Sequence, residues 1–323
     1  MAAISAQSTT RRPLVGVSSC LLGQEVRFDG GHKLDKFVRS KLGEFVDYVP
    51  ECPEVAIGLG IPRAPIRLSM NGGQVRVIGV KDPTLDVTDK LDAYAHAVHA
   101  KGRQLAGYVF KKGSPSCGME RVKIYTEGGM PLSNGSGRFA HRFMELNPLL
   151  PCEEDGRLND MAIRESFVER VFTLHRWQRF AGEGLTPGGL VDFHTRHKYL
   201  ILSHSEVGYR QLGRMVAEAG AANLHELCQA YIGHVMQSMR QRATRKRHAN
   251  VLQHLLGFLS RTLESADRKT LNDMVDEYRL GKIPLVVPIR FLRYHFARQP
   301  NEFVSLQYYL HPYPEDLGIR NQL

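Results

Sequence analysis

The pattern of apolar and polar positions changes near residue 158. Before it, short apolar runs such as 14–17 and 107–110 indicate buried strands, and helical patterns stand between them. After it, apolar residues recur every three or four positions in one segment after another, most clearly along 251–259. The pattern predicts an α/β first domain followed by an all-α second domain.

The first domain begins with strand, loop, helix and strand, which is the order of a parallel crossover. We predict the helix over 35–46, the second strand over 46–49 and a loop over 50–54. A Rossmann-like, mostly parallel sheet is therefore expected. The further predicted elements are a hairpin turning at Asn71-Gly72-Gly73, a helix capped by Thr88 and running to about residue 105, strands over 107–110 and 122–125, a loop over 134–137 and a helix over 138–146.

A helical pattern from residue 159 and a glycine-rich break over 182–189 form the expected linker, residues 159–189. The all-α domain is expected over 190–323. Prolines toward its end are expected to shorten the elements there. The predicted helices cover 190–202, 208–219, 223–239, 244–259 and 265–280.

The first twelve residues are mostly small and polar, and we expect residues 1–12 to form a disordered arm before a domain over 13–158. The start of the chain lacks the apolar core of a secretory signal. No apolar run approaches the roughly 20 residues needed to span a bilayer. These features predict a soluble, cytoplasmic protein without a membrane partner.

The formal net charge of +10 is spread over the chain, with +4 in residues 1–158 and +6 in residues 159–323. A basic balance favours phosphate-bearing partners, and nucleic acid is one of them. A basic but merely solvated surface explains the same balance equally well.

Five cysteines in a chain without a signal argue against a disulfide framework. Three of them, Cys20, Cys52 and Cys117, each follow a predicted strand. Cys152 and Cys228 have no motif around them and are interpreted as packing residues. The position shared by the first three indicates a common site.

In an open parallel sheet the carboxyl ends of the strands line one edge, so the three strand-end thiols can converge there. Thiolates suit zinc or iron–sulfur clusters, and the domain has no Cys-x-x-Cys pair typical of structural zinc. A cluster held by three cysteines leaves one iron open to substrate. Burial of all three as core thiols is the alternative, and a Cys–His nucleophile is less favoured because no histidine is near them in sequence.

The segments VSSCLLG at 17–23, VRFDG at 26–30, CPE at 52–54 and KGSPSCG at 112–118 resemble, in order and spacing, the motif set of the thiouracil and 4-thiouridine desulfidase family. The resemblance covers residues 13–158. Residues 190–320, with FHTRHKY at 193–199, resemble a second domain of unknown function that is fused to the first in many bacterial proteins.

The resemblance implies a 4Fe–4S cluster held by Cys20, Cys52 and Cys117, with Glu54 and Ser114 as essential residues. The open iron would bind the thiocarbonyl sulfur, Glu54 would act as general base, and Ser114 would donate a hydrogen bond or pass on a proton. Sulfur is exchanged for oxygen without net redox change. From the residues alone, a salt bridge or helix cap for Glu54 and a turn role for Ser114 are the favoured interpretations.

The implied substrate is 4-thiouracil, 4-thiouridine or its 5′-monophosphate, as expected for nucleotide salvage from tRNA degradation products, and the basic balance favours the phosphorylated form. Candidate substrate ligands are Arg27, Arg63, Lys112 and Ser116, with Lys33 and Lys111 as further candidates for an anion. The rival interpretation is a nucleic-acid-binding or repair-associated protein with a structural zinc or cluster.

In the second domain His194 and His197 share one helical face, but no carboxylate completes a metal-ligand spacing, so packing is favoured over a metal site. We also expect this domain to close over the site of the first and to read a substrate phosphate. Arg196, Lys198 and Arg245 are the candidates for that contact.

Overall fold

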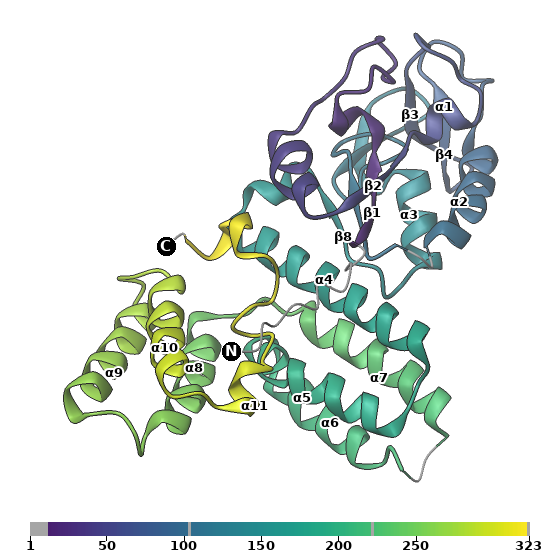
Figure 1. Ribbon diagram of the computed structural model, residues 1–323. Coiled ribbons are helices and arrows are strands. Elements are labelled where there is room, and N and C mark those ends of the chain that lie inside the picture. Colours follow the sequence, from purple (N-terminus) through teal and green to yellow (C-terminus); the bar gives the residue numbers. More distant parts are fainter. Residues whose placement is uncertain (1–11, 103–104, 221–222, 322–323) are drawn as a thin grey trace. The chain divides into compact units, whose positions relative to one another are not determined.

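The computed structural model describes residues 12–102, 105–220 and 223–321 (Figure 1). The chain divides into a first compact unit that ends at Gly156 and a second that begins at Arg157. Of the disordered arm predicted over 1–12, all but Arg12 lies outside the described residues. Among the helices of the described ranges, none combines the length and the apolar character that crossing a membrane requires.

The strands described in the first unit are β1 (Leu14–Ser18), β2 (Asp47–Glu51), β3 (Ile66–Asn71), β4 (Gln74–Gly79), β5 (Gly107–Phe110), β6 (Val122–Tyr125), β7 (Pro131–Gly135) and β8 (Cys152–Glu154). They form two four-stranded sheets. The first has the order β2-β1-β5-β8 and is parallel throughout. The second has the order β4-β3-β6-β7 and is mixed. The α/β class with a parallel sheet is therefore confirmed, while the second sheet was not predicted as a separate layer.

The helical segments of the first unit are a 3-10 turn (Ser19–Leu22), a π-turn (Phe37–Lys41), a second 3-10 turn (Leu42–Glu44), α1 (Pro53–Ala56), α2 (Thr88–Gly102) and α3 (Arg138–Leu146). The segment predicted as a helix over 35–46 is helical over 36–44, as a π-turn that runs directly into a 3-10 turn. The loop predicted over 50–54 is also wrong, because β2 continues through Pro50 to Glu51. A proline is tolerated there because β2 lies at the edge of its sheet.

Two further predictions need correction. The residue predicted to cap α2 is the first residue of that helix, and the Thr88 hydroxyl accepts a hydrogen bond from the Val77 N–H at 2.8 Å. The loop predicted over 134–137 begins two residues too early, since Asn134 and Gly135 belong to β7 and pair with β6. In both places a contact with a neighbouring strand overrides the local signal.

The second unit is all-α, as predicted. Its described helices are α4 (Met161–Glu183), α5 (Pro187–His204), α6 (Glu206–Ala217), α7 (Leu224–Met239), α8 (Arg245–Leu259), α9 (Ser265–Arg279), α10 (Val286–Arg298) and α11 (Glu302–Ser305), with 3-10 turns at Arg157–Asn159, Glu315–Leu317 and Ile319–Asn321. Helix α10 was missed because Pro288 was expected to shorten this region. It lies in the first turn, where an N–H has no partner within the helix to lose.

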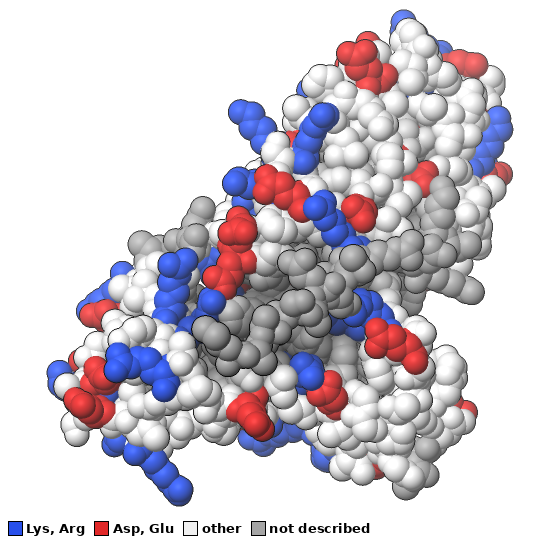
Figure 2. Space-filling model, in the orientation of Figure 1, with Lys and Arg blue, Asp and Glu red and all other residues white. Residues whose placement is uncertain are grey.

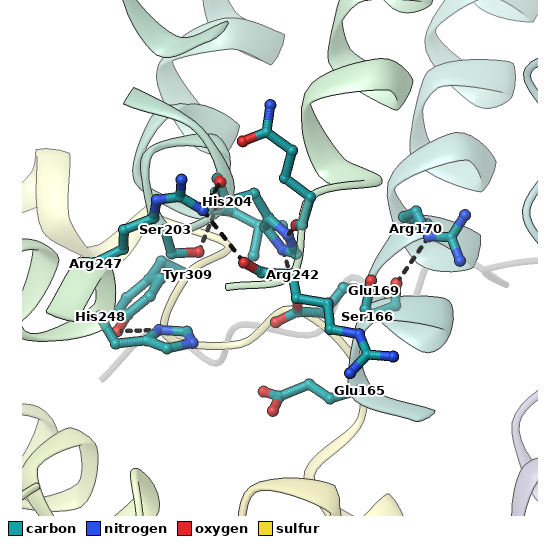
Figure 3. Close-up of polar contacts among 12 residues, drawn as sticks. Glu165, Ser166, Glu169, Arg170, Ser203, His204, Arg242, Arg247, His248 and Tyr309 are labelled. Atoms are coloured by element: carbon teal, nitrogen blue, oxygen red, sulfur yellow. Dashed lines mark hydrogen bonds and ion pairs between the residues drawn. The ribbon is translucent and has the colours of Figure 1, made fainter. Parts of the chain in front are cut away.

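Charged side chains occupy the interior of the second unit. Glu169 on α4 accepts hydrogen bonds from His204 Nε2 at 2.9 Å and from Arg320 Nη2 at 2.7 Å, and Arg320 Nε donates to Glu165 at 2.7 Å. The side chains of Glu169, His204 and Arg320 are exposed by 1%, 0% and 8%. We call Glu169, His204 and Arg320 the buried charge cluster, and Glu165, whose side chain is 21% exposed, borders it. Figure 3 shows Glu165, Glu169 and His204 beside the His248–Tyr309 hydrogen bond. The cluster ties the C-terminal segment to α4 and α5.

Candidate active site

The parallel sheet changes its direction of winding between β1 and β5. The chain passes from β1 outward to β2 on one side, and β5 and β8 follow on the other side. At such a switch point the loops beyond the carboxyl ends of the strands diverge and leave a crevice. The Lys111 N–H just after β5 donates to Ser18 Oγ at the end of β1 across 2.9 Å. A cavity of about 410 Å³ opens at this edge.

The three strand-end cysteines all line this cavity. Cys20 lies in the 3-10 turn after β1, Cys52 lies between β2 and α1, and Cys117 lies in the loop after β5. Cys20 and Cys117 are buried and Cys52 is partly exposed. Cys152 and Cys228 are not among the residues that line it. The structure therefore brings together the same three thiols that share the strand-end position in the sequence.

The environment of these thiols disfavours the thiolate in the absence of a cation. Burial raises the pKa of the Cys20 thiol to about 11, although nearby Lys111 opposes the change. Burial also raises the pKa of Cys52, and it raises the pKa of Cys117 well above its usual value. Binding of a cationic metal group would replace the protons and release them.

The spacing of the donors bears on which group they could hold. Within the described ranges, no three or more His, Cys, Asp or Glu side chains are close enough together to share one metal ion. Three thiolates of an iron–sulfur cluster bind different irons, so they stand around a cavity instead of meeting at one point. The three cysteines line one cavity, and thiolates are the ligands that iron–sulfur clusters use.

Glu54 is held beside the thiols by three side chains. Its Oε2 accepts a hydrogen bond from Arg63 Nε at 2.8 Å, and its Oε1 accepts from Ser116 Oγ at 2.9 Å and from Ser114 Oγ at 3.4 Å. Arg63 also donates to two backbone carbonyls, at 2.9 and 3.0 Å. The Glu54 side chain is 13% exposed and the Arg63 side chain 5%. The carboxylate is therefore oriented firmly and still lines the cavity.

The loop that carries Ser114 and Cys117 is rigid. Ser114 Oγ accepts hydrogen bonds from the N–H groups of Ser116 at 3.2 Å and Cys117 at 3.1 Å, and the Gly118 N–H closes a turn onto the Ser114 carbonyl at 2.9 Å. Gly137, the N-cap of α3, packs directly against this loop. A Cβ there would lie 2.6 Å from the Ser116 carbonyl carbon, so only glycine allows the approach.

Three of the four candidate substrate ligands line the cavity, namely Arg27, Arg63 and Lys112. The Lys112 side chain is exposed, and its backbone N–H donates to Asp155 at 2.7 Å. Arg63 is engaged by Glu54, as described above. Ser116 is fully buried and is not part of the cavity lining, so its hydroxyl meets Glu54 and does not face a substrate.

Two acidic residues at the same edge were not predicted. Glu51 ends β2, is 6% exposed, lines the cavity and accepts a hydrogen bond from the Tyr94 hydroxyl. Asp155 follows β8 and pairs with Lys111 Nζ at 2.6 Å. Glu51 could have been found, because it precedes Cys52 at a strand end. Asp155 could not have been found, because β8 has the sequence Cys-Glu-Glu, which contains no apolar run that would predict a strand.

The candidate residues of the second unit have local partners. Arg196 pairs with Asp192 at 2.6 Å, and Lys198 Nζ lies 4.3 Å from the centre of the Phe303 ring. His194 Nδ1 meets the Tyr231 hydroxyl at 3.1 Å, which agrees with the packing interpretation. On the face drawn in Figure 2, basic and acidic side chains are interspersed and form no surface of one sign. Phosphate reading by Arg196, Lys198 and Arg245 stays a prediction.

Comparison with known proteins yields a match for each unit. A family model described as 2-thiouracil desulfurase matches residues 15–155, and one described as a protein of unknown function, DUF1722, matches residues 198–314. The uncharacterized protein YbgA of Escherichia coli (strain K12) is 32% identical over 165 residues, which are 51% of this chain and 98% of YbgA. The uncharacterized protein YbbK of Bacillus subtilis (strain 168) is 31% identical over 130 residues, which are 38% of this chain and 85% of YbbK.

Among solved structures, a 4Fe-4S-dependent thiouracil desulfidase, TudS, is 30% identical to this chain. The match covers 48% of this chain and 99% of that chain, with a TM-score of 0.37. The two sequence matches to nearly complete relatives, together with the two family models, show that the chain belongs to the 2-thiouracil desulfurase family, in a two-domain form whose second unit is a DUF1722 domain.

Proposed function

We propose that the first unit catalyses the desulfidation of a thiolated pyrimidine, namely 4-thiouridine 5′-monophosphate or 4-thiouracil. Water supplies the oxygen that replaces the thiocarbonyl sulfur, sulfide is released, and no net electron transfer occurs. The observation that carries the proposal is the placement of three thiols around one cavity beside an oriented carboxylate, in a chain of the 2-thiouracil desulfurase family.

The cofactor that we infer is a 4Fe–4S cluster held by Cys20, Cys52 and Cys117. The three thiols that line one cavity and the membership of the chain in the 2-thiouracil desulfurase family support this choice. When bound, the cluster supplies an iron without a protein ligand, which acts as a Lewis acid toward a soft sulfur atom.

The chain's own residues perform the proton chemistry. Glu54 lines the cavity and would take a proton from the attacking water as a general base. Arg63 and Ser116 hold its two oxygens, so the carboxylate keeps one orientation. Ser114, whose hydroxyl is 3.4 Å from Glu54 Oε1, would donate a hydrogen bond to the pyrimidine ring or return the proton.

Two cations of the cavity, the partly exposed Arg27 and the exposed Lys112, would select the substrate. Arg27 and Lys112 line the cavity, and neither is engaged by Glu54. A phosphate on the substrate could meet them through charge-assisted hydrogen bonds. We therefore propose that the monophosphate is preferred over the free base.

The test is turnover by anaerobically reconstituted protein, followed by loss of the thiocarbonyl absorbance and by sulfide release. 4-Thiouracil, 4-thiouridine and its 5′-monophosphate are compared as substrates, and protein without iron is the control. We expect the highest kcat/KM for the monophosphate, and a Lys112→Gln variant should lose that preference while it keeps turnover of the free base. Iron-loaded protein that converts none of the three substrates would refute the proposal.

A further inference from the structure

The second unit has a cavity of its own. It has a volume of about 610 Å³ and lies where the C-terminal turns of α4 meet the N-terminus of α5. Arg176 from α4, His197 from α5 and Tyr308 from the segment after α11 line it. The proposed desulfidation uses none of these residues.

Two buried nitrogens that belong to residues of this cavity wall have no hydrogen-bond partner among the described residues. They are Arg176 Nη1 and His197 Nε2. Arg176 Nη2 donates to the Pro312 carbonyl at 2.5 Å, and its guanidinium lies 3.8 Å from the centre of the Tyr308 ring. The His197 side chain is completely buried between the rings of Phe193 and Tyr308, at 3.9 and 4.5 Å. Unpaired buried nitrogens are costly, and a ligand could supply their partners.

The two nitrogens differ in what they require. His197 Nδ1 lies 2.7 Å from the Phe193 carbonyl, which can only accept, so Nδ1 carries the proton. Burial and the nearby Arg176 charge lower the pKa of His197 well below its usual value, so the ring is neutral. His197 Nε2 is therefore an acceptor that needs a donor, whereas Arg176 Nη1 is a donor that needs an acceptor.

The charged side chains that line the cavity are three arginines and two carboxylates, Glu183 and Asp192, so their net charge favours an anion. Burial lowers the pKa of Arg176 to about 10, which leaves it charged at neutral pH. Thr186, the N-cap of α5, lines the same cavity, and the positive end of an 18-residue helix therefore lies at its wall. Arg179 and Arg196 also line it, although each is paired with a carboxylate, at 3.7 and 2.6 Å.

We propose that this cavity binds a hydrogen phosphate group, either inorganic phosphate or the phosphate of a small monoester. An anionic oxygen accepts from Arg176, and the P–OH group donates to His197 Nε2. Hydrogen phosphate offers both functions. Sulfate has the same shape and charge but has no proton to donate, so it satisfies Arg176 alone.

The first experiment is calorimetric titration of the full chain with inorganic phosphate and, in parallel, with sulfate. Phosphate should bind at least tenfold more tightly, because sulfate leaves the His197 acceptor unpaired against an anion. The same titrations of a Lys112→Gln variant, which lacks the phosphate contact proposed for the first unit, isolate the cavity of the second unit, and the tenfold preference for phosphate should remain in that variant. Equal affinities for the two anions, or no phosphate binding at all, would overturn the proposal.

Two substitutions place the binding in this cavity. His197→Phe keeps a ring between Phe193 and Tyr308 and should bring the phosphate affinity down to that of sulfate. Arg176→Gln should abolish binding of both anions, while Arg179→Gln, at the exposed rim, should change it by less than threefold. If Arg176→Gln does not fold, the phosphate affinity of His197→Phe and the ratio of phosphate to sulfate affinity in the wild type still test the proposal. Phosphate binding that neither substitution weakens contradicts the assignment.

A third titration distinguishes the source of the phosphate. Glycerol 3-phosphate at pH 6, where about half of a monoester still carries its P–OH, is tested against wild type and His197→Phe. Binding that depends on His197 assigns the site to monoesters. Failure of glycerol 3-phosphate to compete with inorganic phosphate assigns it to the free ion.

Discussion

Each unit of this protein holds a carboxylate against an arginine, and the two pairs differ in their access to solvent. In the first unit Arg63 holds Glu54 at 2.8 Å, and in the second Arg320 holds Glu169 at 2.7 Å. Glu54 is 13% exposed and lines a cavity, whereas Glu169 is 1% exposed and shares its second oxygen with His204.

The same kind of ion pair therefore serves two purposes. Where the carboxylate is buried, no bound molecule can reach it, and the pair can only hold segments together. At a cavity wall an oriented carboxylate can exchange a proton with a bound molecule. Both pairs consist of a glutamate and an arginine. The proposed catalytic group differs from the buried charge cluster because a molecule in the cavity can reach its carboxylate.

The largest effect is expected at the thiols. Cys20→Ser, Cys52→Ser and Cys117→Ser should each abolish cluster loading, because the hydroxyl that replaces the thiolate is a poor ligand for iron. Iron and sulfide per chain after anaerobic reconstitution measure this. Cys152→Ser and Cys228→Ser are the matched controls and should load fully. Full iron content in any of the first three variants would remove that cysteine from the ligand set.

Glu54→Gln tests the pair of Glu54 and Arg63, whose carboxylate lines the cavity. It should lower kcat by about 100- to 10,000-fold while the cluster spectrum stays unchanged, because a general base is lost and no ligand is touched. Glu44→Gln, an exposed position in the same unit, is the control and should keep wild-type turnover. Near-normal kcat in Glu54→Gln would show that this carboxylate is not the base.

Arg320→Met tests the buried pair of Arg320 and Glu169. It removes the cation but leaves Glu169 buried, so the free energy of unfolding should fall by about 3–5 kcal/mol. Urea unfolding followed by fluorescence of Trp177, the single tryptophan of the chain, reports on the second unit. Arg293→Met, which breaks an exposed pair with Glu315, should cost less than about 1 kcal/mol. Equal losses in the two variants would contradict the distinction between buried and exposed pairs.

Mild acid should weaken the second unit by a smaller amount. Burial lowers the pKa of His194 to about 4 and of His248 to about 3, and that of His197 well below its usual 6.5. Between pH 6.5 and the lowered pKa values, these histidines are protonated in the unfolded chain and neutral in the folded chain. The free energy of unfolding therefore falls as the pH drops through this range. At pH 5.5 each histidine costs about 1 kcal/mol.

The measurement is urea unfolding at pH 7.5 and pH 5.5, followed by Trp177 fluorescence. His197→Phe removes one of these histidines and should reduce the acid effect by the roughly 1 kcal/mol assigned to it. A free energy of unfolding that is the same at both pH values would disprove the role of the buried histidines.

Much of the fold could be predicted because the relevant signals are local. The strand over 107–110 and the helix over 138–146 have the predicted bounds, since an apolar run and a helical period depend on neighbouring residues only. Local signals failed where a neighbouring strand intervened. Pro50 was expected to end a strand, but it stands at a sheet edge that needs no N–H from it.

The site shows the same division. Strand-end placement was sufficient to group Cys20, Cys52 and Cys117, because parallel strands present their carboxyl ends at one edge. The partners of Glu54 could not be assigned in this way. Ser116 looked like a substrate ligand, and only the packed loop shows that its hydroxyl is turned inward to the carboxylate.

The sequence by itself determined the two-part architecture, the three thiols and the motif set that identifies the family, since period, spacing and residue type are written along the chain. Only the tertiary structure decided which carboxylates line a cavity and which are buried. Arg320 and Glu169 are 151 residues apart, and no local pattern encodes their contact. Packing alone brings such groups together, and packing sets whether solvent or substrate can reach them.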